Sequence, residues 1–145
     1  MKIEIHSRES IEELINGNFP ENAAVISFYN IGDEPVNYKG KAARLFQIAI
    51  NDIDMSDMSE YDLTCETFLP EAPALADFIV AAVEDNMGII CQCDYGEGRS
   101  AGCAAAILEF YEHRGIKIFA DYKYYPNKLI YHSILNALIA IKNPR

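Results

Sequence analysis

The chain has 145 residues, of which 50% are hydrophobic and 11% aromatic, so it can form one compact globular domain over residues 1–145. Its formal net charge of −10 argues against nucleic acid as a partner, because phosphate backbones are bound by clustered lysines and arginines. The same charge disfavours binding to an anionic membrane, and any phosphate-bearing ligand requires a local positive site.

The N-terminal segment MKIEIHSRES becomes polar within a few residues, so we expect no signal peptide. No apolar run reaches the roughly 18 residues of a membrane span. We therefore expect a cytoplasmic protein whose four cysteines are thiols. The three histidines are scattered and the cysteines form no C-x-x-C pair, so we expect no metal.

The first half of the chain predicts three strands and one short helix. Residues 2–6 alternate between apolar and polar side chains, as a half-buried strand does. Ser10-Ile11-Glu12-Glu13 has the spacing of a capping box and predicts a helix that opens there and ends near Gly17. The apolar runs at 23–29 and 44–50 are typical of buried strands, with a polar loop between them. The acidic stretch NDIDMSDMSEYD that follows predicts a loop or a short helix.

The second half predicts three helices and one strand. Residues 70–86 carry apolar side chains at helical spacing, which predicts a helix with one buried face. Residues 88–91 predict a short central strand, and the alanine-rich residues 100–114 favour a helix. A last helix is predicted to start at Pro126, because proline favours the first helical position, and to run to about residue 142. The whole pattern predicts an α/β fold with a central, mostly parallel sheet flanked by helices.

The most informative stretch is CQCDYGEGRS, where a predicted strand leads into a predicted helix through two glycines. Such a turn points successive backbone N–H groups into one concavity, and the helix N-terminus adds positive charge, so the turn binds anions. Gly96 and Gly98 allow close approaches that a Cβ would block. The guanidinium of Arg99 matches two phosphate oxygens. The same field stabilises a thiolate at Cys93, to which Ser100 can donate a hydrogen bond.

This C-x5-R-S arrangement resembles the phosphate-binding loop of the cysteine-dependent protein tyrosine phosphatases, including the dual-specificity group. Cys93, Gly96, Gly98, Arg99 and Ser100 fall on that family's C-x-x-G-x-G-R-[ST] pattern. The later YYPNKLIYHSIL segment is similar to small bacterial members.

The resemblance implies a protein tyrosine phosphatase-like fold and hydrolysis of phosphate monoesters, such as phosphotyrosine, through a phosphocysteine intermediate on Cys93. It implies no metal or cofactor, and the partner it implies is a phosphorylated protein or a small phosphate ester. Arg99 and the loop amides would bind the phosphate oxygens, and Ser100 would assist the departure of the sulfur. The implied substrate-binding residues are Asp94, Tyr95, Gly96, Glu97, Gly98 and Arg99.

The family also uses an aspartate, on a loop upstream of the cysteine, as the general acid that protonates the leaving oxygen. Asp52, which follows the predicted strand at 44–50, is the first candidate for this role. Asp54 is the second, and Asp57 and Asp62 are further alternatives. A solvated turn or a helix cap is the competing interpretation of Asp52.

Several residues depart from the family pattern. Gln92 replaces the usual histidine before the nucleophile, so the hydrogen bonds that position Cys93 must be made differently. Asp94 and Glu97 place carboxylates in or beside the loop, and each would weaken the binding of a dianion by about 1 kcal/mol if partly exposed. Tyr95 stands where small residues are frequent, and is expected to wall the pocket or to stack on an aromatic substrate.

Two other functions compete with catalysis. A catalytically weak or inactive phosphate-binding module, a pseudophosphatase, would keep the loop without turnover, and a thiol-redox protein would use Cys91, Cys93 or Cys103. Cys91 and Cys103 are more simply interpreted as core residues on the strand and helix that flank the loop. The three histidines are interpreted as structural or surface residues.

Overall fold

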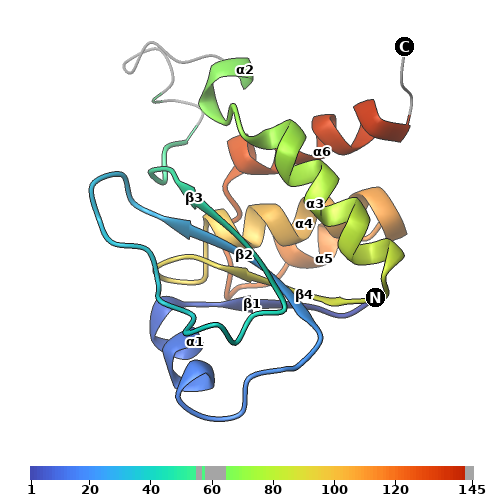
Figure 1. Ribbon diagram of the computed structural model, residues 1–145. Helices are drawn as coiled ribbons and strands as arrows, with labels where there is room; N and C mark the ends of the chain where they lie inside the picture. Colours follow the sequence, from blue (N-terminus) through green and yellow to red (C-terminus); the bar gives the residue numbers. More distant parts are fainter. Residues whose placement is uncertain (55–56, 58–64, 143–145) are drawn as a thin grey trace.

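The computed structural model describes residues 1–54, 57 and 65–142 (Figure 1). These residues form one four-stranded sheet in which every strand pairs in parallel with its neighbours, in the order β1-β4-β2-β3. The strands are β1 (Ile3–His6), β2 (Ala23–Tyr29), β3 (Arg44–Ala49) and β4 (Gly88–Gln92). The helices are α1 (Arg8–Ile15), α2 (Cys65–Phe68), α3 (Ala72–Glu84), α4 (Arg99–Glu112), α5 (Ile116–Phe119) and α6 (Lys128–Lys142). The predicted α/β class with a parallel sheet is confirmed.

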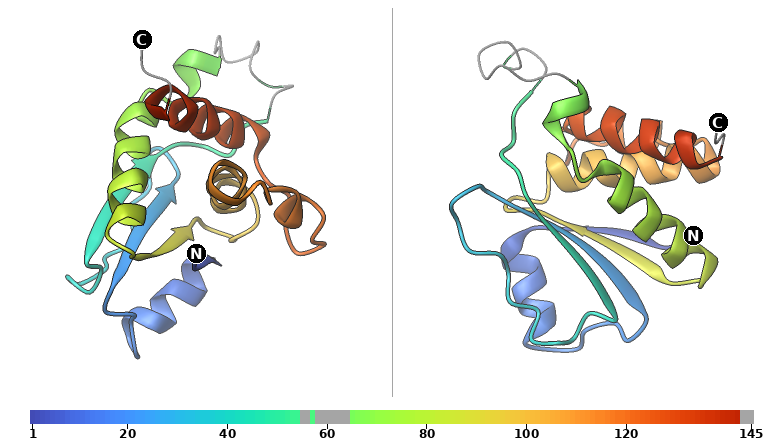
Figure 2. Two further views of the ribbon diagram at one scale, coloured as in Figure 1. Left: turned by 90° about the vertical axis from the view of Figure 1, so that its right-hand side faces the viewer. Right: turned by 45° about the horizontal axis from the view of Figure 1, so that its top comes forward.

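Helices cover both faces of the sheet (Figures 1 and 2). The larger apolar cluster joins one sheet face to α3, α4 and α6, with Phe28, Leu75 and Ile134 fully buried at its centre. The smaller cluster packs Ile11 of α1 against Val25 and other residues of the opposite face. The strands at the centre of the sheet, β2 and β4, are mostly apolar because they are buried on both sides, and their buried polar side chains Ser27 and Gln92 bond to each other.

Helix boundaries differ from the prediction by a few residues, and for the starts of α1 and α6 the cause is a capping side chain. Helix α1 begins at Arg8, because the side chain of Ser7 accepts a hydrogen bond from the backbone N–H of Ser10 and caps the helix. Helix α6 begins at Lys128 rather than at Pro126, with Asn127 accepting from the N–H of Ile130. The four-residue helices α2 and α5 were not predicted, since one turn shows no helical period.

None of the helices within the described residues is long and apolar enough to cross a membrane.

The fold brings several loops together at one edge of the sheet. Because the strands are parallel, their carboxyl ends all meet there, and the chain leaves β2, β3 and β4 next to the N-terminus of α4.

Candidate active site

The loop between β4 and α4 is packed against the junction of β1 and α1. The backbone N–H of Cys93 donates to the carbonyl of His6 at 3.2 Å, and the N–H of Arg8 donates to the carbonyl of Asp94 at 3.0 Å. Gly96 has a φ of +69°, and a Cβ added there would lie 2.7 Å from the backbone nitrogen of Ser7. Only glycine fits this position, both for its backbone angle and for its space.

Cys93 and Ser100 meet at the two ends of the loop. The Cys93 Sγ lies 3.0 Å from the Ser100 Oγ, and both residues are buried, Cys93 at 2% exposure. Ser100 is in the first turn of α4, so the sulfur lies beside a helix N-terminus, whose partial positive charge favours anions. The loop therefore places a nucleophilic atom, a hydroxyl and an anion-binding helix end together.

Arg99 is almost fully buried, with 3% of its surface exposed. Its Nη1 donates to Asn30 Oδ1 at 2.8 Å and to the Ile50 carbonyl at 2.6 Å, and its Nη2 lies 3.9 Å from Asp94 Oδ2. Among the described residues, the buried Nε of Arg99 has no hydrogen-bond partner. A buried guanidinium N–H is costly to leave unpaired, so this donor fits an anionic ligand that accepts from it.

The two acidic side chains of the loop are disposed differently. Asp94 is half-buried, and its Oδ2 accepts from the Asn30 amide at 2.9 Å while lying near Arg99. Glu97 is exposed, and its carbonyl accepts from the backbone N–H of Tyr125 at 2.8 Å. The charge of Asp94 is thus partly balanced by donors within the site, and that of Glu97 is screened by solvent.

Tyr95 is 81% exposed and does not enclose the loop. It borders an open groove between the loop and α1, together with Arg8, Glu9 and Glu12. Its ring is available at the surface beside Asp94.

Asp52 lies directly against the loop, although 41 residues separate it from Cys93 in the sequence. Its Oδ2 is 2.6 Å from the position that a Cβ on Gly98 would occupy, and its Oδ1 accepts from the Asn127 amide at 2.7 Å. Asp54 is exposed and Asp57 is half-buried a few residues further along the chain. The fourth candidate, Asp62, lies outside the described residues.

Gln92 points to the sheet face opposite Cys93. Strand alternation places it beside Ile90 and α1, where Ser27 Oγ donates to its Oε1 at 2.5 Å and Tyr38 OH donates to the same oxygen at 2.8 Å. Its Nε2 has no partner within the described part of the chain. The position of Cys93 is instead set by the His6 carbonyl and Ser100.

Cys91 and Cys103 are fully buried in the larger apolar cluster, which confirms their predicted packing role. Burial, together with the neighbouring Cys91 thiol, raises the pKa of Cys103 well above its ordinary value. His6 bonds to Ser10 and Glu4, and His113 caps the end of α4 at the surface. The described residues contain no cluster of three His, Cys, Asp or Glu side chains arranged to hold a metal.

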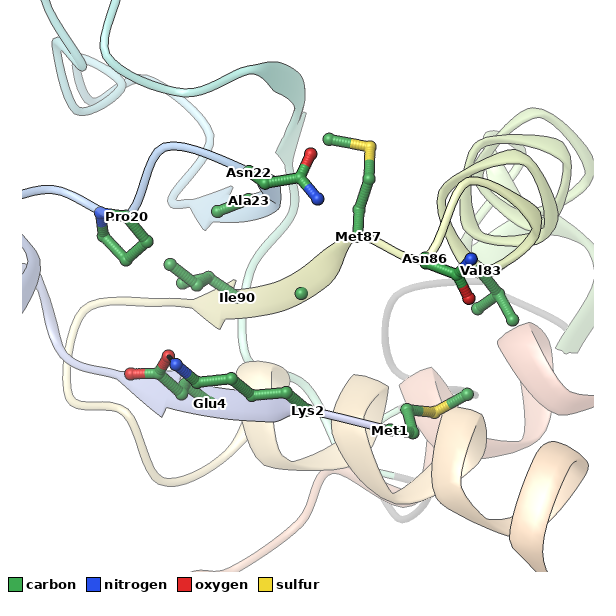
Figure 3. A pocket seen from close by; sticks show the side chains of 11 residues that line it. Met1, Lys2, Glu4, Pro20, Asn22, Ala23, Val83, Asn86, Met87 and Ile90 are labelled. Carbon is green, nitrogen blue, oxygen red and sulfur yellow. Dashed lines mark ion pairs between the residues drawn. The ribbon is translucent and has the colours of Figure 1, made fainter.

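A separate pocket of about 530 Å³ lies at the opposite, amino-terminal edge of the sheet (Figure 3). It is lined by the starts of β1, β2 and β4 and the end of α3, and its charged side chains, Lys2 and Glu4, pair with each other at 3.6 Å. The described residues that line it include no serine, threonine or cysteine and no unpaired cation, so the loop at the carboxyl edge is the better candidate for chemistry.

Sequence reasoning missed three residues of the site. Asn30 and Ile50 hold Arg99, and Asn127 holds Asp52. The first two could have been suspected because Asn30 directly follows one predicted parallel strand and Ile50 is the last residue of another. Nothing local to Asn127 indicated that its amide contacts residues 52 and 53.

No protein-family model and no curated protein matches the chain. Solved structures do match along almost all of it. Human DUSP28 is 12% identical with a TM-score of 0.61, covering 99% of this chain and 95% of its own. The human tyrosine phosphatase-like serine/threonine/tyrosine-interacting protein is 16% identical with a TM-score of 0.58, covering 94% and 87%. PTPMT1 in complex with PI(5)P is 12% identical with a TM-score of 0.57, covering 98% and 93%.

At these identities the matches establish the fold. The chain has the fold of the dual-specificity group within the cysteine-dependent protein tyrosine phosphatase superfamily. The resemblance that the sequence of the loop indicated is confirmed at that level.

The packing of Gly96 generates a stability prediction. Gly96→Ala combines strain at positive φ with a clash against the Ser7 backbone, and we expect a loss of at least about 3 kcal/mol in the free energy of unfolding. Gly40→Ala is the matched control, because Gly40 has a φ of +73° and no atom of the described residues lies within 4 Å of the added Cβ. It should cost about 1–2 kcal/mol, from backbone strain alone. Urea unfolding measures both, and equal losses would contradict the close packing of the loop.

The buried hydroxyl of Tyr38, which donates to Gln92, generates a prediction about stability at high pH. Burial raises the pKa of Tyr38 to about 12, so the folded protein keeps a proton that the unfolded chain loses near pH 10. The stabilisation from neutral Tyr38 is fully present below pH 10 and is lost between pH 10 and 12, by up to about 2–3 kcal/mol. Tyr38→Phe should therefore lose less stability than the parent protein between pH 9 and 12 in urea unfolding. Equal losses of stability in the two proteins over this pH range would show that the Tyr38 hydroxyl is exposed to solvent instead.

Proposed function

We propose that the protein is a cysteine-dependent phosphatase that hydrolyses phosphate monoesters, with phosphotyrosine or a similar small ester as substrate. The observation that carries the proposal is the buried Arg99, which belongs to the same loop as Cys93 and whose Nε donor has no partner among the described residues. A phosphate in the loop would accept from that donor and from the N-terminus of α4. The fold shared with DUSP28 supports the same activity.

In the first step the thiolate of Cys93 attacks phosphorus. The new S–P bond forms as the bond to the leaving oxygen breaks, and Arg99 with the loop amides stabilises the charge on the equatorial oxygens. Asp52, lying against Gly98, donates its proton to the leaving oxygen. The products of this step are the dephosphorylated alcohol or phenol and a phosphocysteine.

In the second step water attacks the phosphocysteine and releases inorganic phosphate. The carboxylate of Asp52 takes a proton from that water, by the reverse of its first role. Ser100 Oγ, 3.0 Å from the sulfur, donates a hydrogen bond to the departing thiolate. Every atom needed for this cycle comes from the substrate, water and the residues named.

We propose a phosphorylated protein or a small phosphate ester as the physiological partner, and a cytoplasmic location stays a prediction from the sequence.

The second candidate function is phosphate binding without turnover. Gln92 in place of histidine favours it, because Gln92 faces Ser27 and Tyr38 rather than the nucleophile. Measured turnover separates the two.

The first test is hydrolysis of p-nitrophenyl phosphate between pH 5 and 7 under reducing conditions. We expect turnover by the parent protein, complete loss in Cys93→Ser, and retention in the control Cys103→Ala, whose thiol is fully buried in the larger apolar cluster. Turnover that persists in Cys93→Ser would contradict the mechanism. A parent protein that binds vanadate without turnover would establish the binding module instead.

The second test concerns the general acid. Asp52→Asn should lower turnover of phenyl phosphate, a poor leaving group, by about 100-fold or more, because protonation of the leaving oxygen is lost. Turnover of difluoromethylumbelliferyl phosphate, whose leaving group needs no proton, should change little. Asp54→Asn and Asp57→Asn are the controls, and a selective loss in either would transfer the role to that residue.

A further inference from the structure

Asn127 precedes α6 and is 6% exposed, and its side-chain amide uses both its donor and its acceptor group. The Nδ2 group donates to Asp52 Oδ1 at 2.7 Å and to the Ile53 carbonyl at 3.0 Å, while Oδ1 accepts from the N–H of Ile130 at 3.0 Å. One side chain therefore connects the segment after β3 to the start of α6.

These bonds exceed what capping a helix requires. An N-cap needs only an oxygen that accepts from the first turn, and Ser, Thr or Asp supplies one as well as Asn. Of these residues only Asn also carries an NH₂ group with two donors. The donors of Asn127 are both directed to the segment that holds Asp52.

The backbone of Asn127 is held against the phosphate-binding loop. Its N–H donates to the Gly98 carbonyl at 2.9 Å, and that carbonyl also accepts from the N–H of Gly102. The approach is close enough that a Cβ on Gly102 would lie 2.5 Å from the Asn127 carbonyl oxygen. Asn127 is thus placed relative to the loop by its main chain and places Asp52 by its side chain.

The two oxygens of Asp52 are distinguished by this arrangement. Oδ1 is occupied by the amide of Asn127, whereas Oδ2 is the oxygen closest to the empty Cβ position of Gly98. The carbonyl oxygen of a neutral carboxyl group is a stronger acceptor than its hydroxyl oxygen, so the bond from Asn127 to Oδ1 favours placing the proton of a neutral Asp52 on Oδ2. Oδ2 is the oxygen that faces the loop.

We infer that Asn127 is the positioning residue for the general acid, directing the protonated oxygen of Asp52 toward the leaving group at the loop. As the bond from phosphorus to the leaving oxygen breaks, the Oδ2 proton moves to that oxygen, and the N–H of Asn127 stays bonded to Oδ1 of the carboxylate that forms. This inference rests on the proposed function, because it requires Asp52 to act as the acid. Asp52 is exposed to solvent, so without Asn127 its carboxyl would sample several rotamers.

The test compares Asn127→Ser with Asp52→Asn. Serine keeps an oxygen for the helix N-terminus but cannot reach Asp52 with a donor. We expect turnover of phenyl phosphate to fall by about 10-fold or more, while turnover of difluoromethylumbelliferyl phosphate and inhibition by inorganic phosphate change less than about twofold. In the Asp52→Asn background, Asn127→Ser should have no further effect on phenyl phosphate, because the two residues act through one proton transfer.

Asn127→Asp is the second variant, and it keeps both the side-chain volume and the helix cap. It replaces the donor with a carboxyl group facing Asp52, and two adjacent carboxyls hold a shared proton to higher pH. The alkaline limb of the pH profile for phenyl phosphate should therefore move upward. Ser133→Ala is the control, since it removes a buried polar group of α6 that has no partner among the described residues, and it should leave turnover of both substrates unaffected.

The outcomes separate the two proposals. Loss of turnover on both substrates by the same factor, or additive effects in the double variant, would show that Asn127 only supports the fold and would overturn this inference. That result leaves the phosphatase proposal intact as long as Asp52→Asn stays selective for the poor leaving group. Absence of Cys93-dependent turnover in the parent protein would overturn both.

Discussion

The buried guanidinium of Arg99 is the interaction on which the site depends. A charge with 3% exposure needs polar partners inside the protein, because desolvation otherwise costs several kcal/mol. The partners come from the ends of neighbouring strands: the carbonyl of Ile50 after β3, the amide of Asn30 after β2 and the carboxylate of Asp94 after β4. They meet because all strands run in one direction and end at the same edge.

Arg99 is the first residue of α4, a helix that is buried along most of its length. Small side chains on α4 allow this burial. All residues from Arg99 to Ile107 are buried, between the sheet on one side and α6 on the other. The run of alanines that favours a helix also lets three layers approach closely. The closest approach is at Gly102, where the absence of a Cβ leaves space for the backbone of Asn127. That position allows the Asn127 side chain to contact Asp52.

The molecule carries a net charge of −10 around a site suited to an anion. The long-range field therefore repels anions, and an anion could be bound only through contacts at short range. The structure provides them without removing the acidic residues: Asp94 is held by Asn30 and faces Arg99, and Glu97 is at the surface. A buried donor in a low dielectric outweighs exposed carboxylates that solvent screens.

The sequence by itself determined the α/β class, the core strands and the loop around Cys93, because apolar period and glycine spacing are local properties. It also pointed to Asp52, though only through a resemblance. The tertiary structure alone decided that Asn30 and Ile50 hold Arg99, that Gln92 faces away from Cys93, and that Asn127 contacts Asp52. These contacts join residues 49 to 75 positions apart, and such separations leave no periodic trace in a sequence. The loop could be recognised from its own residues, whereas the groups that orient it depend on where parallel strands end and on how closely α6 packs.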